Sequence, residues 1–169
     1  MDVEDAIRGR RTHKQFGAEP LPRALLEELL DLARFAPNHR LTQPWRFRVL
    51  GPQSRTRLAQ AAGPKEAAKL ARAPTLVVVS ARLSGDPLQD EEDLHATAAA
   101  LYAVLLGAEA RGLASYWRTP ACLREEVGRE AVGLGADERF VGLLHLGPRA
   151  STPPPKERER LGAVLEYLP

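Results

Sequence analysis

The sequence predicts an α+β protein with roughly four strands and five or six helices. Three observations support this prediction. The run TLVVVSA at 75–81 is apolar and rich in β-branched residues, which is typical of a strand covered on both faces. Residues 22–36 repeat leucine at helical spacing. Residues 96–108 are apolar on every side, as expected for a helix at the centre of a molecule or in a subunit interface.

The first half of the chain predicts mostly helix. In order, the expected elements are a helix at 3–8, a helix from Pro22 to Pro37, a strand at 45–51, and helical segments at 55–62 and 66–72. Pro22 suits a first helical turn, and Pro37 ends the second helix because it cannot donate to the preceding turn. The strand WRFRVLG alternates apolar and polar side chains, which indicates one buried face.

The second half alternates strands with helices and ends in an arm. In order, the expected elements are a strand at 75–81, a helix at 90–111, a strand at 113–117, a helix at 123–132, and a strand at 140–147. Residues 148–169 contain three consecutive prolines followed by an apolar end. We expect residues 1–169 to form a single domain. Its arm at 148–169 is expected to pack on a partner subunit.

Composition excludes several classes of protein. The formal net charge of the 169 residues is only +2, which argues against a nucleic-acid binder. The single cysteine, Cys122, rules out an internal disulfide framework. The acidic start of the chain lacks the apolar run of a signal peptide, and residues 96–108 are too short to span a bilayer. A soluble, cytoplasmic protein without membrane or nucleic-acid partners is therefore expected.

The first candidate site is RRTHKQF at 10–16, with one further cation, Arg8, just before it. Arg10 and Arg11 could hold phosphate oxygens bidentately, Thr12 adds a hydroxyl, and Lys14 adds a compact charge. Together they could bind a phosphate monoester. The alternative is a solvated basic surface. Neither G-x-G-x-x-G nor G-x-x-x-x-G-K-[ST] occurs in the chain.

Two further segments carry candidate binding residues. The segment 35–47 places Asn38, His39 and Gln43 between two prolines, in a polar loop joining a helix to a strand. This loop could instead serve only to cap the helix. The segment 115–123 offers Trp117 and Arg118, which could stack on and hydrogen-bond a planar ring. The alternative is a core tryptophan beside an arginine that extends to solvent.

Other chemistries have weaker support. The four histidines lack paired metal spacing and the lone cysteine lacks a C-x-x-C partner, so no metal site is predicted. No G-x-S-x-G motif indicates a hydrolase nucleophile. His145 lies in an apolar strand and is expected to be a hydrogen-bonded core histidine. The carboxylates at 91–93 are expected to form a solvated helix start.

Taken in order, the three segments resemble the nitroreductase family of flavoproteins. The family's Arg-Arg-Ser-x-[Arg/Lys]-x-Phe pattern corresponds to Arg10–Phe16, with Thr12 in place of serine. Its Ala-Pro-[Ser/Asp/Asn] and Gln-Pro-Trp motifs correspond to residues 36–38 and 43–45. The Gly-Leu-x-x-x-Trp strand corresponds to 112–117, and an apolar strand ends in Leu-Gly at 147. The resemblance covers nearly the whole chain and is strongest to the short, single-domain bacterial branch.

This resemblance implies a nitroreductase-like sandwich, in which helices flank a central, mainly antiparallel sheet and FMN lies at a homodimer interface. It implies that Arg10, Arg11 and Thr12 hold the phosphate and ribityl chain, and that Lys14 reaches the N1–O2 edge of the flavin. The remaining implied ligands are Pro37, Asn38, His39 and Gln43 from the partner chain, and Trp117, Arg118 and Thr119 along the ring. The family's basic residue near the C-terminus has two candidate equivalents, Lys156 and Arg158.

The function predicted is an FMN-dependent oxidoreductase that takes hydride from NAD(P)H and reduces a nitroaromatic, quinone or related small-molecule acceptor by a ping-pong mechanism. Because flavin N5 carries the chemistry, no catalytic side chain is required. The alternative within the resemblance is a flavin-binding carrier or sensor without significant turnover. The choice between NADH and NADPH stays open, as do the dehalogenating and flavin-destroying activities found among family relatives.

Overall fold

A four-stranded antiparallel sheet forms the centre of the protein, and the computed structural model describes all residues 1–169. Its strands are β1 (Trp45–Val49), β2 (Thr75–Arg82), β3 (Leu113–Arg118) and β4 (Glu138–Pro148). The strand order is β1-β2-β4-β3, and every neighbouring pair is antiparallel. The predicted α+β class and antiparallel sheet are confirmed.

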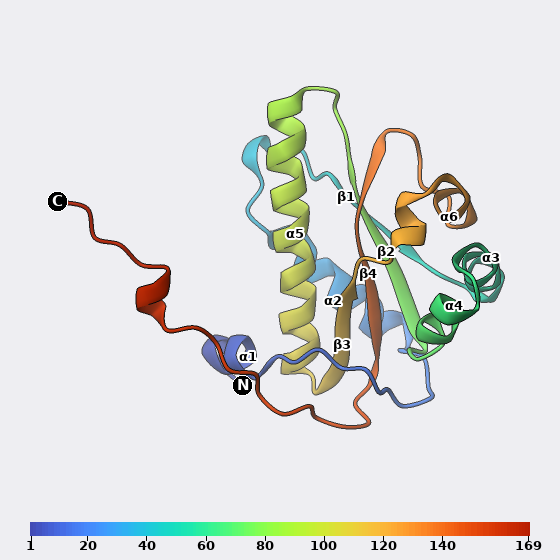
Figure 1. Ribbon diagram of the computed structural model, residues 1–169, viewed down its shortest axis with the longest axis horizontal. Helices are drawn as coiled ribbons and strands as arrows, with labels where there is room; N and C mark the ends of the chain where they lie inside the picture. The colour runs from blue at the N-terminus through green and yellow to red at the C-terminus, as the bar shows by residue number, and fades with distance from the viewer.

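Helices cover both faces of this sheet (Figure 1). In chain order they are α1 (Val3–Gly9), α2 (Arg23–Asp31), α3 (Pro52–Ala62), α4 (Pro64–Leu70), α5 (Pro87–Ala110) and α6 (Glu126–Ala131). The helices α2 and α5 lie over one face, whereas α3, α4 and α6 lie over the other (Figure 1). None of the helices combines the length and the apolar character that a membrane crossing requires.

Two apolar layers result from strand alternation. In β2, Val77 and Val79 pack against the α2–α5 layer, while Leu76 and Val78 pack against the opposite layer. All four side chains are buried, as the β-branched run predicted. The sheet is therefore a rigid scaffold, and the segments with the candidate site residues lie at the ends of its strands.

Helix α5 starts three residues before its predicted start at Asp90. The Asp86 carboxylate accepts the backbone N–H of Gln89 at 2.8 Å, and Pro87 occupies the first turn. Further along, Gly107 lies against Leu32, and a Cβ on this glycine would overlap the leucine side chain. The helix can therefore approach the segment that follows α2.

The predicted helix at 123–132 is broken in two. A 3-10 turn covers Ala121–Arg124, Glu125 is extended, and α6 covers only Glu126–Ala131. The break places Gly128 against the carbonyl of Cys122, where an added Cβ would overlap the backbone. The helix from Pro22 also changes character before Pro37, because its last turn, Leu32–Phe35, is 3-10.

The C-terminal arm extends away from the body of the molecule (Figure 1). Its only regular element is a 3-10 turn at Leu161–Ala163. Four large apolar side chains of its end are at least 68% exposed, namely Leu161, Val164, Tyr167 and Leu168. Nothing within one chain covers them.

Candidate functional site

The segment 10–16, which we call the N-terminal arm, crosses the ends of β3 and β4. The His13 N–H donates to the Ser115 carbonyl at 3.0 Å, and Phe16 forms a bridge to Arg149. The N–H of Gly17 donates to the Pro148 carbonyl at 2.8 Å. These backbone bonds fix the arm, so its polar side chains are held along one edge of the sheet.

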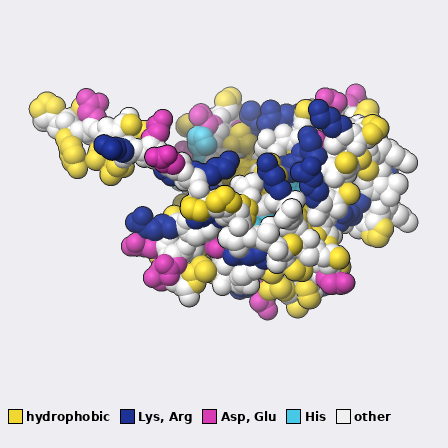
Figure 2. Space-filling view, turned by 60° about the horizontal axis from the view of Figure 1, so that its bottom comes forward, with side chains coloured by type: hydrophobic (Ala, Val, Ile, Leu, Met, Phe, Trp, Pro, Cys, Tyr) yellow, Lys and Arg dark blue, Asp and Glu magenta, His cyan; other side chains and the backbone are white.

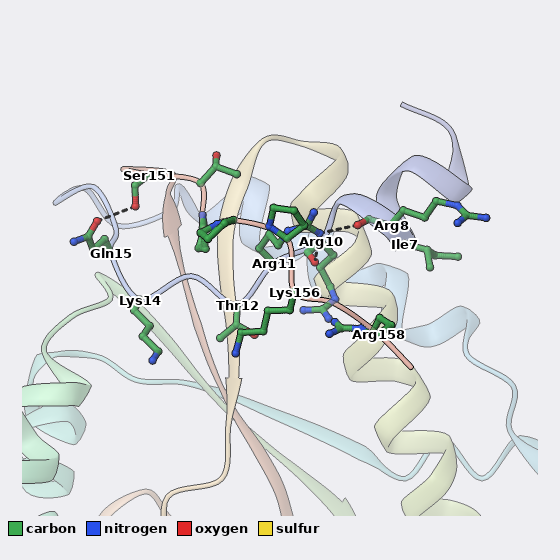
Figure 3. Close-up of a pocket in the computed structure, with 14 residues that line it drawn as sticks. Ile7, Arg8, Arg10, Arg11, Thr12, Lys14, Gln15, Ser151, Lys156 and Arg158 are labelled. Atoms are coloured by element: carbon green, nitrogen blue, oxygen red, sulfur yellow. Dashed lines mark hydrogen bonds between the residues drawn. The ribbon is translucent and has the colours of Figure 1, made fainter. Parts of the chain in front are cut away.

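The start of the C-terminal arm runs beside the N-terminal arm. The Ser151 hydroxyl donates to the Gln15 side-chain carbonyl at 2.8 Å. Between the two arms lies a cavity of about 810 Å³ (Figure 3). Its cations and hydroxyls come from both arms and from the last turn of α1, namely Arg8, Arg10, Arg11, Thr12, Lys14, Ser151, Thr152, Lys156 and Arg158.

The cations of this cavity have no carboxylate partners apart from Arg8, which pairs at its surface with Glu4. The Nε atoms of Arg10 and Arg11 are buried and lack hydrogen-bond partners. Figure 2 shows Lys and Arg side chains gathered on the face that includes this end of the molecule. A cavity with such unneutralised donors can hold a multiply charged anion such as a phosphate monoester.

The two arginines differ in their contacts. Arg10 lies over the Tyr102 ring, 5.9 Å from its centroid. One terminal nitrogen of Arg11 donates to the carbonyls of Arg8 and Gly9 at 2.6 and 2.9 Å. Arg11 thus satisfies carbonyls at the end of α1 and retains other donors for a ligand.

Lys14 also lines a second, smaller hollow on the α4 side of the arm. This hollow contains Lys69, Arg72, Arg118 and His145, together with the aromatic rings of Phe16 and Tyr116. Sequence reasoning missed Lys69 and Arg72 as site residues. Their only signal was a pair of cations on the short helical segment before the strand at 75–81.

One carboxylate, that of Glu66, neutralises part of the positive charge in this hollow. Glu66 accepts hydrogen bonds from Arg118 and, at 3.0 Å, from Lys69. Burial by itself would raise the pKa of Glu66, but these two cations hold that pKa below its ordinary value. Two cations facing one carboxylate, with Lys14 and Arg72 beside them, leave the hollow positively charged.

His145 is buried at the floor of the hollow, as the sequence predicted, but its expected hydrogen bonding is wrong. Its Nε2 has no partner. Burial, followed by the charges of Arg118, Arg55 and Arg72, lowers its pKa to about 3. The imidazole is therefore neutral and adds no charge near neutral pH.

The loop 37–43 has a dense network of its own. The Asn38 side-chain oxygen accepts the Gln43 N–H at 2.7 Å, and its amide nitrogen donates to Thr42 at 3.0 Å. Three residues, Arg40, Leu41 and Gln43, have positive φ. Such strain in non-glycine residues persists only where surrounding contacts impose it, and it is found most often at binding sites.

The network is anchored on the start of α5. The Thr42 hydroxyl donates to Asp93 at 2.5 Å, and His39 Nδ1 lies 2.7 Å from the Glu92 carboxylate. The expectation of a solvated acidic helix start is therefore wrong for Asp93, which is 3% exposed. Its carboxylate is buried because the loop supplies donors to it.

The loop and the arms lie at opposite ends of α5 (Figure 1). Asp93 holds the loop, whereas Glu109 binds Arg149 beside the N-terminal arm at 2.7 Å. At 1.5 Å per residue, these two positions are about 24 Å apart along the helix. Pro37, Asn38, His39 and Gln43 therefore do not meet Arg10, Arg11 and Thr12 within one chain.

The predicted ring-binding residues of the segment 115–123 lie in different environments. Trp117 packs against the apolar layer under α5, and its indole N–H donates to the Val141 carbonyl at 3.2 Å. The indole fits there because Gly142 has no side chain to obstruct it. Arg118 faces the hollow, and Thr119 is exposed after the strand ends. Of these three residues, only Arg118 lines one of the described cavities.

The structure is that of an α+β protein with a cationic cavity at the edge of its sheet. The chain belongs to the nitroreductase family, whose model matches residues 7–65. YdjA of Escherichia coli strain K12, whose name places it among the NAD(P)H nitroreductases, is 30% identical, and the alignment covers 87% of this chain and 88% of that protein.

Solved structures agree with this assignment. The nitroreductase-like family protein from Bacillus cereus is 27% identical, has a TM-score of 0.90 and covers 99% of this chain and 96% of its own. A Desulfovibrio desulfuricans protein in complex with FMN has the same fold. Its TM-score is 0.83 at 23% identity, with 99% and 96% of the two chains covered.

Proposed function

We propose that the protein is an FMN-dependent oxidoreductase that uses NAD(P)H to reduce nitroaromatic, quinone or related acceptors. Membership of the nitroreductase family supports the class of reaction. The cavity between the two arms carries the proposal, because it gathers unneutralised cations and hydroxyl side chains from both ends of the chain. A phosphate is the part of FMN that such a set recognises.

The residues fit the phosphate of FMN. Arg10 and Arg11 have buried Nε atoms without partners, so a bound anion would complete their hydrogen bonding. Lys156 and Arg158 both line the cavity, and thus both candidate equivalents of the family's C-terminal cation can face the phosphate. Thr12 is exposed and free to donate its hydroxyl to phosphate or ribityl oxygens.

Lys14 would hold the other end of the cofactor. It lines both the large cavity and the small hollow, and in Figure 3 it lies on the other side of Thr12 from Arg158. We assign it to the N1–O2 edge of the flavin, and Lys69 in the same hollow adds to the positive potential there. When bound, FMN supplies hydride transfer at N5. The Lys14 and Lys69 cations would favour negative charge at the N1–O2 edge of the ring.

We propose that a second copy of the chain completes the site. The loop bearing Pro37, Asn38, His39 and Gln43 is too far along α5 to reach its own N-terminal arm, so it would serve the partner's cofactor. An apolar stripe on α5 could form the interface, since Ala99 and Tyr102 are exposed and Leu106 is half-buried. The exposed apolar end of the C-terminal arm would pack on the same partner.

The chain's own part in the reaction is binding and orientation. Arg118 lies at the end of β3 in the hollow, and we assign it to the edge of the ring. Trp117 packs in the apolar layer and would support the strand that carries Arg118. One open pocket would serve donor and acceptor in turn. A ping-pong mechanism is therefore expected, with the oxidised nicotinamide leaving before the acceptor enters.

The test is spectroscopic and then kinetic. Purified protein should show visible flavin absorption, which NADH or NADPH bleaches without oxygen and a nitroaromatic or quinone restores. Acceptor titrations at several NAD(P)H concentrations should give parallel double-reciprocal lines. Intersecting lines would refute the single alternating pocket. A flavin that binds but is not bleached by either nucleotide would instead indicate a carrier or sensor.

A further inference from the structure

His13 is the one residue between Thr12 and Gln15 that is directed into the protein. Its side chain is 1% exposed, whereas Thr12 and Lys14 on either side are exposed. Adjacent side chains of an extended segment point to opposite sides. Burial of the His13 ring therefore sets the direction in which Thr12 and Lys14, two proposed FMN ligands, face the cavity.

The ring and backbone of His13 exchange two hydrogen bonds with Ser115 at β3. The His13 N–H donates to the Ser115 carbonyl at 3.0 Å. The Ser115 N–H donates in return to His13 Nδ1 at 3.3 Å. Because Nδ1 accepts, the ring proton lies on Nε2, which has no partner. A second ring proton would occupy Nδ1 and remove the bond from Ser115.

The charged groups around His13 come from two other elements. Arg149, just after β4, and Glu109 of α5 form an ion pair at 2.7 Å, and both act on the ring. Burial and then the Arg149 charge lower the pKa of His13 below 6.5. The backbone carbonyls of Ser115 and Arg11, and the Glu109 carboxylate, favour the charged ring and oppose this shift without reversing it. The docked arm therefore favours a neutral ring.

We propose that His13 is a positioning residue, which holds the N-terminal arm in the orientation that binds FMN only while its ring is neutral. Protonation of Nδ1 removes the hydrogen bond from the Ser115 N–H, loosens the arm and weakens FMN binding. This inference rests on the proposed function for its ligand. It assigns to the arm a pH response that the phosphate-binding arginines cannot provide, because they stay charged throughout the same range.

Proton linkage gives the direction in which FMN affinity changes with pH. The released arm exposes a histidine with the ordinary pKa of 6.5, and the docked arm holds it lower. The released state therefore binds more protons below pH 6.5. FMN affinity is therefore highest above pH 6.5. It falls as the pH drops toward the pKa of the docked ring, by at most about tenfold per pH unit.

The test compares the FMN dissociation constant between pH 7.5 and 5 in wild type and in His13→Asn. The asparagine carbonyl can accept the Ser115 N–H but does not titrate in this range. The phosphate of FMN itself gains a proton near a pKa of about 6. Both proteins share that effect, so the difference between their profiles isolates His13. The control, His95→Gln, removes an exposed histidine of α5.

Wild type and His95→Gln should lose affinity more steeply in acid than His13→Asn, with a gap that widens below pH 6.5 by at most about tenfold per pH unit. Equal profiles for wild type and His13→Asn would overturn the proposal.

A second measurement, amide hydrogen exchange, needs neither a variant nor FMN. The His13 backbone amide should exchange with solvent faster at pH 5 than the intrinsic chemistry predicts, while the amides of β2 stay protected. Unchanged protection of that amide would also overturn it.

These outcomes separate the two proposals. Failure of wild type to bind FMN at pH 7.5 would refute the proposed function. The amide-exchange measurement would then still decide whether His13 controls the docking of the arm.

Discussion

Arg10 and Arg11 are neighbours in the chain with different tasks. One terminal nitrogen of Arg11 donates to the carbonyls that end α1. The Arg10 guanidinium lies over Tyr102 and makes no hydrogen bond within the chain. Arg10 is therefore the better probe of phosphate binding, because its removal leaves the helix end intact. Arg11→Ala would alter the fold of the arm as well as the anion site.

We expect Arg10→Ala to weaken FMN binding by one to two decades. A charge-assisted hydrogen bond contributes about 1.5–3 kcal/mol. Fluorescence titration of apoprotein with FMN measures the change. Arg23→Ala is the matched control, since Arg23 pairs with Glu27 at the surface of α2 and lies outside the cavity. Unchanged affinity in Arg10→Ala would rule out its phosphate role.

Lys14 should tune the flavin more than anchor it. We expect Lys14→Met to make bound FMN harder to reduce, because the variant lacks a cation that stabilises negative charge at the N1–O2 edge. A midpoint potential shifted to more negative values would confirm this. An unaltered potential with FMN still bound would contradict the assignment.

At the scale of elements, a half-buried polar cluster joins the edge strand β1 to β4. Arg48 donates to both Glu138 oxygens, at 2.7 and 2.5 Å, and Ser80 of β2 donates to the same carboxylate. Burial alone would raise the pKa of Glu138, but the bonds from Arg48 and Ser80 hold it below its ordinary value of 4.5. The cluster fixes the strand that follows the loop 37–43.

We expect Glu138→Gln to destabilise the fold by about 3 kcal/mol, since it leaves the Arg48 charge without its partner. Because the carboxylate has a lowered pKa in the folded state, its contribution is fully present above pH 4.5 and disappears as the pH falls through the folded pKa. Urea unfolding at pH 7 and pH 3 measures this. A gap between wild type and variant that does not narrow in acid would contradict it.

Most elements could be predicted from sequence because their signals are local. The strand at 75–81 and the long helix before residue 111 appear where periodicity placed them. The break inside 121–131 was missed because it depends on the contact between Gly128 and the Cys122 carbonyl, which periodicity does not encode.

The candidate site was predictable only in part. Motif order indicated Arg10, Arg11, Thr12 and Lys14, and the structure brings these residues together in one cavity. The roles of Lys69, Asp93 and His13 were missed because each depends on a neighbour far away in the chain. Asp93 has the sequence signature of a solvated helix start, and only the loop at 38–42 explains its burial.

At the scale of the whole molecule, one chain leaves two surfaces without a partner, namely the apolar stripe of α5 and the end of the C-terminal arm. The proposed homodimer, with the large, apolar interface of obligate assemblies, would cover both. The same dimer would bring the loop of one chain to the N-terminal arm of the other.

Truncation before Pro153 should weaken the dimer and lower its FMN content together. The truncated chain lacks the apolar end of the arm as well as Lys156 and Arg158 of the cavity. Light scattering at micromolar protein, with flavin absorbance on the same sample, measures both. A wild-type monomer that still holds FMN would contradict the dimer.

The most direct test of a shared FMN site mixes two defective variants. Arg10→Ala damages the phosphate end of the site, and Asn38→Ala damages the loop proposed to come from the partner. In a mixed dimer, one site carries both defects and the other carries neither. We predict that differently tagged, co-expressed mixed dimers bind one FMN per dimer with wild-type affinity, while either variant alone binds weakly. Mixed dimers that bind FMN no better than their parents would contradict a site shared between chains.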